Sequence, residues 1–317
     1  MSTSQNHGDL FRPLRGCPNL RIACDTIPEQ FTLVYRYFSD HLLGLAQTDL
    51  PTQVTKRILK DALRGLAVMH DHDIVHTVVE QVQLADLEDS AYVPPGCDIV
   101  GKQAGNWMWR SPEAHASGPV NKPSDIFSFG VVCIYAVHKR IIFAVSEEEL
   151  GDGEEILAHV LERQISYFAD EEGLDALYKH LGNDNPWVHV FDILQGGFNK
   201  DNPRRPVSLW KDVDPELRNL VGGLTNFDPA KRLTAREALE HPWFKDNNDL
   251  DWASLEVYRS GGCLIWPTID LSLSLSNNRD GGGIAAGQGP GTTNDGLDHG
   301  AAGARPRTID GAIRKGC

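Results

Sequence analysis

The sequence lacks several features that would assign the chain to a large class of proteins. No apolar run reaches the roughly 18–20 residues that a membrane-spanning helix needs, and the N-terminus MSTSQNHGDL lacks the apolar core of a signal peptide. Basic residues are too few for a nucleic-acid-binding stripe, because 44 Asp and Glu outnumber 30 Lys and Arg and give a net charge of -14. We therefore expect neither a membrane nor a nucleic acid as a partner.

Cysteine is also scarce, and its six residues are scattered without a C-x-x-C pair. In a chain of 317 residues this pattern indicates reduced thiols in the cytoplasm or nucleus rather than a disulfide framework or a zinc site. Large apolar residues are sparse at both ends. We expect residues 1–19 to form a polar leader, and residues 246–317 a C-terminal extension that is largely disordered after about residue 275.

Two short segments near the N-terminus have the composition of strands. Residues 20–24 and 31–38 are rich in β-branched and aromatic residues, and Pro28 lies in a turn-like stretch at 25–30. This pattern predicts a β-hairpin. Residues 51–70 carry apolar side chains at helical spacing and form the clearest predicted helix.

A second helix is predicted to begin at Pro123, with Ser124 as its N-cap. It is apolar on nearly all sides, so it should be buried. Farther along, residues 147–177 read as helical in pieces, 183–206 as turn-rich, and Pro215–Leu224 as a helix.

Four motifs occur in a fixed order along the chain. They are Asp86-Leu87-Glu88, then Ser111-Pro112-Glu113, then the helix start DIFSFG at Asp125, and finally FDPAKRLTAREALEHPWF over residues 227–244. This order and spacing resembles the second half of a eukaryotic Ser/Thr protein kinase domain, with its D-F-G, A-P-E and D-x-W-S-x-G motifs. The resemblance covers residues 20–245. It implies an α+β fold in which residues 39–245 form a mainly α-helical large lobe and residues 20–38 a hairpin and hinge left of the small lobe.

The resemblance implies ATP and Mg²⁺ as cofactors. It places Tyr35 at the gatekeeper position, and Arg36, Tyr37 and Phe38 at the hinge whose backbone meets adenine. It also places Asp86 at the position of a magnesium ligand. The residues by themselves leave two plainer interpretations open, namely a generic hairpin and a surface acidic cluster around Asp86.

The resemblance assigns structural roles to further residues. Glu113 and Arg232 should form a buried ion pair, and Asp125 should tie down the backbone of the catalytic loop. His76 should be a packed core histidine. The stretch HDHDIVH that ends at His76 could also suggest a metal site, but its spacing matches none of the standard ligand patterns.

The catalytic loop itself departs from the family pattern H-R-D-L-x-x-x-N. Thr77 follows His76 where the family has Arg, Val78 stands where the family has its catalytic Asp, and no Lys or Asn lies between His76 and Asp86. Only nine residue steps separate Thr77 from Asp86, where the family has nearly twenty. In addition, no G-x-G-x-x-G precedes Leu20. We therefore expect this chain to be catalytically impaired or inactive, with a truncated small lobe.

Three interpretations remain open from the sequence. The chain could be an active kinase that phosphorylates protein Ser/Thr, a pseudokinase that serves as a scaffold or interaction module, or a truncated or misassembled product of a gene whose full form is active. Each implies a protein substrate or partner, and we expect a monomer. Ser90 and Tyr92 are expected to be exposed and open to phosphorylation, and Trp107 and Trp109 to anchor the segment around them.

Overall fold

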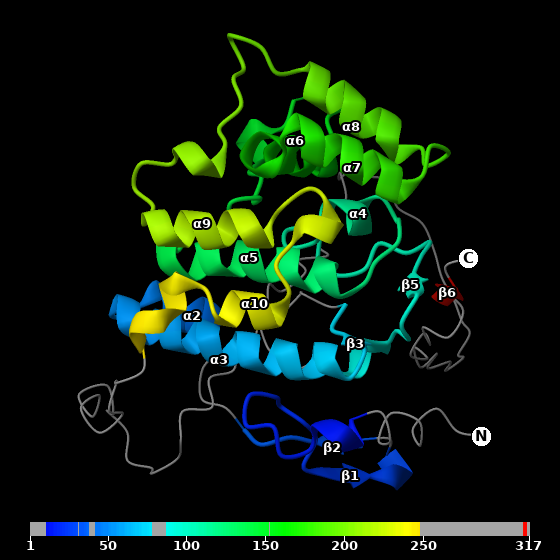
Figure 1. Ribbon diagram of the computed structural model, residues 1–317, viewed down its shortest axis with the longest axis vertical. Coiled ribbons are helices and arrows are strands. Elements are labelled where there is room, and N and C mark those ends of the chain that lie inside the picture. The colour runs from blue at the N-terminus through cyan, green and yellow to red at the C-terminus, as the bar shows by residue number, and fades with distance from the viewer. Residues whose placement is uncertain are drawn as a thin grey trace, which may run out of the picture.

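The computed structural model describes residues 11–30, 32–37, 42–77, 87–151, 153–247 and 313–315. Within these ranges helices dominate and the strands have two or three residues each. This confirms a mainly helical fold with few short strands. Figure 1 shows the helical body as layers around one central helix, with a hairpin at one end and a group of consecutive helices at the other.

The central helix is α5 (Lys122–His138), and every residue from Ser124 to Ala136 in it is buried. Its predicted burial is therefore confirmed, but its predicted start is wrong. The helix begins at Lys122, because the Asn121 side chain accepts a hydrogen bond from the Lys122 backbone N–H at 2.8 Å and so acts as the N-cap. The Ser124 hydroxyl instead lies 2.7 Å from the Ser111 hydroxyl.

The predicted helix at 51–70 is α3 (Thr52–Asp71). It packs against α5, α10 (Ala235–Leu239) and the 3-10 helix Pro242–Asn247. In α10, Thr234 and Glu237 form a reciprocal capping box. The Lys60 ammonium donates to the Phe244 carbonyl at 2.9 Å, which joins α3 to the tract that resembles the end of a kinase domain.

The predicted hairpin is present, but its first strand is shifted. β1 (Asp25–Ile27) pairs antiparallel with β2 (Thr32–Val34), and a 3-10 turn at Pro28–Gln30 joins them. The prediction of a strand at 20–24 is wrong because Leu20 is buried in a cluster under α3 together with Phe11 and Leu14. The expected polar leader thus contributes two residues to the core, one of them from the 3-10 helix Arg12–Leu14.

Two further strand pairs lie beside the helical body. β3 (Ile74–Val75) pairs with β4 (Ala91–Tyr92), and β5 (Cys97–Ile99) pairs with β6 (Ile313–Lys315), both antiparallel. The strand β6 lies in the C-terminal extension that the sequence predicts to be largely disordered. Residues 248–312 and 316–317 lie outside the described part of the chain.

A second hydrophobic cluster is built from three consecutive helices, namely α6 (Ile156–Phe168), α7 (Glu171–Leu181) and α8 (Trp187–Gly196). The prediction of a turn-rich stretch at 183–206 missed α8, whose Phe191 is fully buried in this cluster. The helix α9 (Pro215–Leu224) has the predicted bounds and packs on α5.

The remaining helices are short: α2 (Leu42–Gln47) precedes α3, and α4 (Pro112–His115) precedes α5. Among the described residues, every helix is too short or too polar to traverse a lipid bilayer.

Candidate functional site

The carboxylate of Asp125 holds the backbone just before the missing part of the catalytic loop. It accepts hydrogen bonds from the backbone N–H of His76 at 2.8 Å and of Thr77 at 3.2 Å. The first turn of α5 positions Asp125, and the side chain is only 4% exposed. The role that the resemblance implies for Asp125 is thus present, since a buried carboxylate with charge-assisted bonds fixes this backbone strongly.

The same carboxylate also organises the end of α3. The ring Nε2 of His70 lies 2.9 Å from Asp125 Oδ2. The neighbouring acids and histidines turn to other partners: Asp71 pairs with Arg236, Asp73 with Lys122, and His72 Nδ1 with the Val68 carbonyl. The stretch HDHDIVH therefore disperses its side chains. In the described ranges, no three His, Cys, Asp or Glu side chains gather as a metal site.

Thr77 links this backbone to the segment that begins at Leu87. Its hydroxyl donates to the Asp89 carbonyl at 2.5 Å, and its φ is 58°, in the left-handed region. A β-branched residue there costs free energy, so the surrounding contacts must hold it. In the family pattern an Arg at this position would reach a phosphate; here a short hydroxyl fastens the chain locally instead.

Several residues assigned from the resemblance lie outside the described part of the chain. These are Phe38 in the hinge, Val78 at the position of the catalytic Asp, and Asp86 at the position of the magnesium ligand. Their roles stay predictions.

Leu87, which follows Asp86, is described and is 3% exposed. It lies in one hydrophobic cluster with Met69 and Ile74 from the body and with Phe11 and Leu14 from the leader. The N-terminal segment thus packs on the residue that stands at the Phe position of D-F-G. His76 is 4% exposed, as expected of a packed core histidine.

The described hinge residues, Tyr35, Arg36 and Tyr37, directly follow the end of β2 at Val34. Tyr35 is half-buried under the guanidinium of Arg21, which lies 5.2 Å from the ring centroid. The same guanidinium donates to the Arg36 carbonyl at 3.1 Å. Tyr37 is 85% exposed. The carbonyl that would meet a base at Arg36 is therefore already engaged within the chain.

Glu113 and Arg232 form the buried ion pair. The two guanidinium nitrogens Nη1 and Nη2 lie 2.6 and 2.8 Å from the two carboxylate oxygens, a bidentate arrangement. Burial raises the pKa of Glu113, but the charge and hydrogen bonds of Arg232 outweigh it, and the net shift is downward. Arg232 also donates to the carbonyls of Asn226 and Pro123, so the pair joins α4, α5 and the loop after α9.

The segment before α4 is anchored by aromatic and polar contacts. Trp109 is fully buried and meets Tyr135 edge-on at 5.9 Å between centroids, as the prediction of an anchor requires, whereas Trp107 is half-buried. The expectation that Ser90 is exposed is wrong: it is 5% exposed, because it lies between Leu87 and the buried strand residue Ala91. Tyr92 is 47% exposed.

Sequence reasoning missed one buried titratable residue beside this segment, His115 in α4. It is fully buried, and neither ring nitrogen has a hydrogen-bond partner among the described residues. Burial and the nearby Arg110 charge lower its pKa to about 3. Its position two residues after Glu113, in a tight anchoring segment, was the signal that it would be buried.

The residues present do not make a complete site for ATP and Mg²⁺. Family catalysis needs a catalytic-loop Asp, Lys and Asn, and the stretch from Thr77 to Ala85 contains none of them. The Arg36 carbonyl in the hinge is engaged by Arg21. In the described residues, the structure shows the frame on both sides of the catalytic-loop position, with Asp125 bonded to the backbone of His76 and Thr77.

Comparisons with known proteins agree with this frame. The family model for the protein kinase domain matches residues 21–244. A calcium-dependent protein kinase 22 from Oryza sativa subsp. japonica is 44% identical over 78 residues, which are 24% of this chain and 13% of that protein. A CaM kinase-like vesicle-associated protein from Takifugu rubripes is 24% identical over 262 residues, 74% of this chain and 52% of that protein.

The chain therefore spans about half or less of the length of these curated relatives. The family model, in contrast, covers most of the chain and includes Glu113, Asp125 and Arg232. On the buried pair, the anchored loop backbone and this match, the chain belongs to the protein kinase family.

Proposed function

We propose that this chain is a kinase-fold interaction module that does not transfer phosphate. The observation that carries the proposal is the contrast at His76 and Thr77. Their backbone is held by Asp125, as an ordered catalytic loop would need, yet Val78 follows directly and Lys and Asn are absent. Losing the groups that position and stabilise the transferring phosphoryl removes most of the catalytic effect.

The structural residues support a binding role. Glu113, Asp125 and Arg232 maintain the large lobe without taking part in chemistry, and a folded lobe presents a surface to a protein partner. In this proposal the partner is a protein and the chain acts as a monomer inside the cell. Asp86 remains the candidate position for any residual Mg²⁺-nucleotide binding.

The direct test is a phosphate-transfer assay with the purified full chain, Mg-ATP labelled in the γ-phosphate, and casein and myelin basic protein as acceptors. We expect no time-dependent incorporation above that of the heat-denatured chain. A heat-sensitive, time-dependent signal would contradict the proposal. If that signal persisted in Asp86→Ala, the assignment of Asp86 as the metal position would fail as well.

A second candidate is a defective version of a working kinase, and a specific observation favours it. The loss between Thr77 and Asp86 is one contiguous block of about ten residues between intact flanks, whereas scattered substitutions would be expected of a slowly diverged pseudokinase. Sequencing of full-length transcripts across the codons for Thr77 and Val78 separates the two. A longer transcript with Asp, Lys and Asn there would identify a working kinase locus, and a uniform direct junction would leave the interaction module.

A further inference from the structure

A basic surface with an aromatic and apolar centre is formed by the loop between α8 and α9 together with the ends of α5 and α6. The loop residues 203–211, PRRPVSLWK, contain three cations and no Asp or Glu, in a chain whose net charge is -14. Figure 1 shows this loop running down one side of the molecule to the start of α9. We define the Trp210 surface by the side chains of Arg140, Tyr167, Arg205, Leu209, Trp210 and Lys211.

The centre of this surface is a half-buried indole ring that the chain holds in place. The Trp210 Nε1–H donates to the Arg205 carbonyl at 3.0 Å, and the ring meets the Tyr167 ring edge-on at 5.3 Å between centroids. The Arg140 guanidinium lies over the indole, 5.7 Å from its centroid. Leu209, the preceding residue, is 70% exposed. A fixed aromatic ring beside an exposed apolar side chain suits the centre of a protein-binding site, because the ring loses little conformational freedom on binding.

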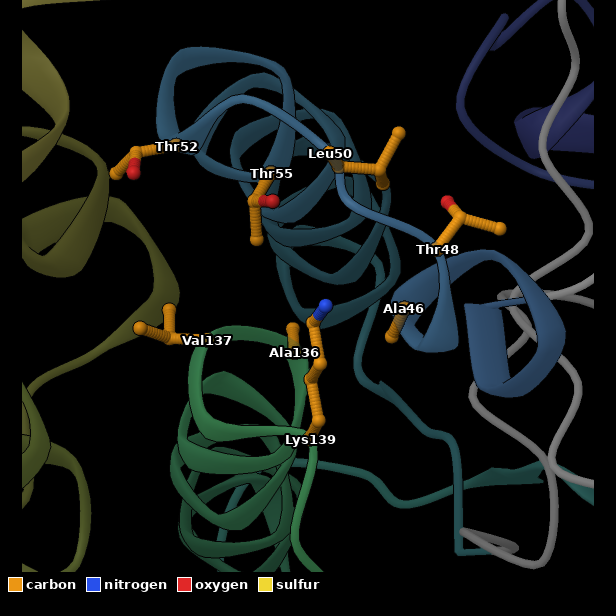
Figure 2. Close-up of a pocket in the computed structure, with 8 residues that line it drawn as sticks. All are labelled: Ala46, Thr48, Leu50, Thr52, Thr55, Ala136, Val137 and Lys139. Carbon is orange, nitrogen blue, oxygen red and sulfur yellow. The ribbon is translucent and has the colours of Figure 1, made fainter.

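The cations around this centre carry charge that the chain does not pair. Arg140, Arg205 and Lys211 are exposed, and none of them forms an ion pair with a residue that the structure describes. The neighbouring Lys139 shows the contrast. Figure 2 shows its side chain extending from the end of α5 toward the first turn of α3, and its ammonium lies 2.9 Å from Asp49 Oδ1. Two consecutive cations at the end of α5 therefore differ, since one has a carboxylate partner and the other lies on the indole.

The acidic residues that follow this loop do not neutralise the surface. Asp214 is the N-cap of α9, where its carboxylate accepts from the Leu217 backbone N–H at 2.9 Å. Asp212 forms no ion pair with any of the described residues. Arg218 adds a further cation at the centre, because its guanidinium donates to the Trp210 carbonyl at 3.0 Å. The surface is therefore locally basic although the chain as a whole is acidic.

We propose that the Trp210 surface binds an acidic segment of a partner protein that carries a large apolar side chain. The apolar side chain packs on Leu209 and Trp210. The carboxylates of the segment pair with Arg140, Arg205 and Lys211, and the planar guanidinium groups suit a carboxylate because they can bind it through two hydrogen bonds. This inference rests on the interaction role proposed above and names the class of partner.

A protein segment suits this surface better than a nucleic acid does. The net charge of -14 repels a long polyanion, whereas a short acidic segment meets only the local positive charge. One face of the indole is also covered by the Arg140 guanidinium, which leaves less of the ring for a stacked base.

The test is a titration of fluorescein-labelled peptides with the purified full chain, read by fluorescence anisotropy at low and at high salt. The peptide EDDLEEFLDE carries acidic and apolar side chains, EDDSEESSDE lacks the apolar ones, and QNNLQQFLNQ lacks the charges. We expect saturable binding of the first peptide that weakens at high salt, and binding of the other two that is weaker by about tenfold or more. No saturable binding of EDDLEEFLDE, or equal binding of all three peptides, would overturn the proposal. Tighter binding of a labelled oligouridylate would overturn it in favour of a nucleic acid.

Three variants locate the binding site. Arg140→Gln and Lys211→Gln each remove one cation and should weaken the binding of EDDLEEFLDE by about threefold to tenfold. Leu209→Ser should weaken it by about threefold or more, because apolar contact area is lost. Circular dichroism and the melting temperature establish that each variant is folded. Leu209 is 70% exposed and makes no part of the core, so Leu209→Ser keeps the test decisive if Arg140→Gln disturbs the indole.

Lys179→Gln is the matched control for Lys211→Gln. Lys179 is likewise exposed and without an ion pair to a described residue, but it lies in the last turn of α7, which packs against α4. The control should bind the peptide as the unchanged chain does, and equal affinities for the two lysine variants would overturn the proposal.

The peptide titration and the phosphate-transfer assay fail separately. Absence of peptide binding overturns this inference and leaves the absence of phosphate transfer standing. Phosphate transfer by a chain that binds the peptide as expected contradicts the proposed function and leaves the binding surface standing.

Discussion

The guanidinium of Arg232 donates two hydrogen bonds to the carboxylate of Glu113, which lies 119 positions earlier in the sequence. Both side chains are almost fully removed from solvent. The ion pair holds α4, which carries Glu113, against the segment after α9 that carries Arg232. The pair therefore joins segments of the helical lobe that are far apart in the sequence.

Removing one member of this pair should destabilise the chain severely. Arg232→Met leaves the Glu113 carboxylate buried without its partner, and we expect the free energy of unfolding to fall by about 3–5 kcal/mol. Urea unfolding followed by circular dichroism measures this. The adjacent Lys231→Ala breaks an exposed pair with Glu172 and should leave the stability nearly unchanged. Equal losses in the two variants would contradict the structural role of the pair.

Asp125→Asn should loosen the loop remnant. The amide keeps one acceptor oxygen, but its NH₂ group cannot accept from the N–H groups of His76 and Thr77. We expect the backbone amides of these two residues to exchange with solvent at least tenfold faster, with a stability loss of about 2 kcal/mol. Native-state hydrogen exchange read by NMR gives the rates. Asp71→Asn, in an exposed pair with Arg236, serves as the control and should leave both amides protected.

His115 should make the chain less stable in mild acid. Its folded pKa of about 3 lies below the ordinary 6.5, so between these values only the unfolded chain binds a proton. Stability should therefore fall as the pH drops below about 6.5, by about 2 kcal/mol from this residue at pH 5. His115→Leu removes this dependence. Urea unfolding at pH 7.5 and pH 5 compares the two chains, and identical pH dependence would contradict the assignment.

Gly130 should not tolerate a methyl group. A Cβ there would lie 2.6 Å from Thr225 Cγ2 and 3.0 Å from Leu224 Cβ, because α5 and α9 approach each other at this residue. We expect Gly130→Ala to cost about 1–3 kcal/mol. Gly222→Ala, in the same helix pair but with nothing within 4 Å of its Cβ, should be neutral or stabilising by up to about 1 kcal/mol. Thermal unfolding of both variants ranks them.

Much of the helical lobe can be predicted from the sequence because its signals are local. The apolar spacing within α3, the apolar run of α5 and the bounds of α9 all lie within one segment of chain. The order of the kinase-like motifs, including the break after Thr77, is likewise a property of the linear sequence. These features determined the family and the expectation of impaired catalysis.

Other features depend on contacts between distant segments, which no local pattern encodes. Leu20 does not form the predicted strand because it packs with Phe11 and Leu14 under α3. The helix α8 forms because its apolar face packs against α6 and α7. Ser90, which stands between the 3-10 turn Leu87–Asp89 and β4, is buried in the folded chain although the local sequence predicts exposure.

The linear sequence determined the helices and the family through local periodicity and motif order, whereas the tertiary structure decided which polar groups are buried together, because burial depends on contacts between distant residues.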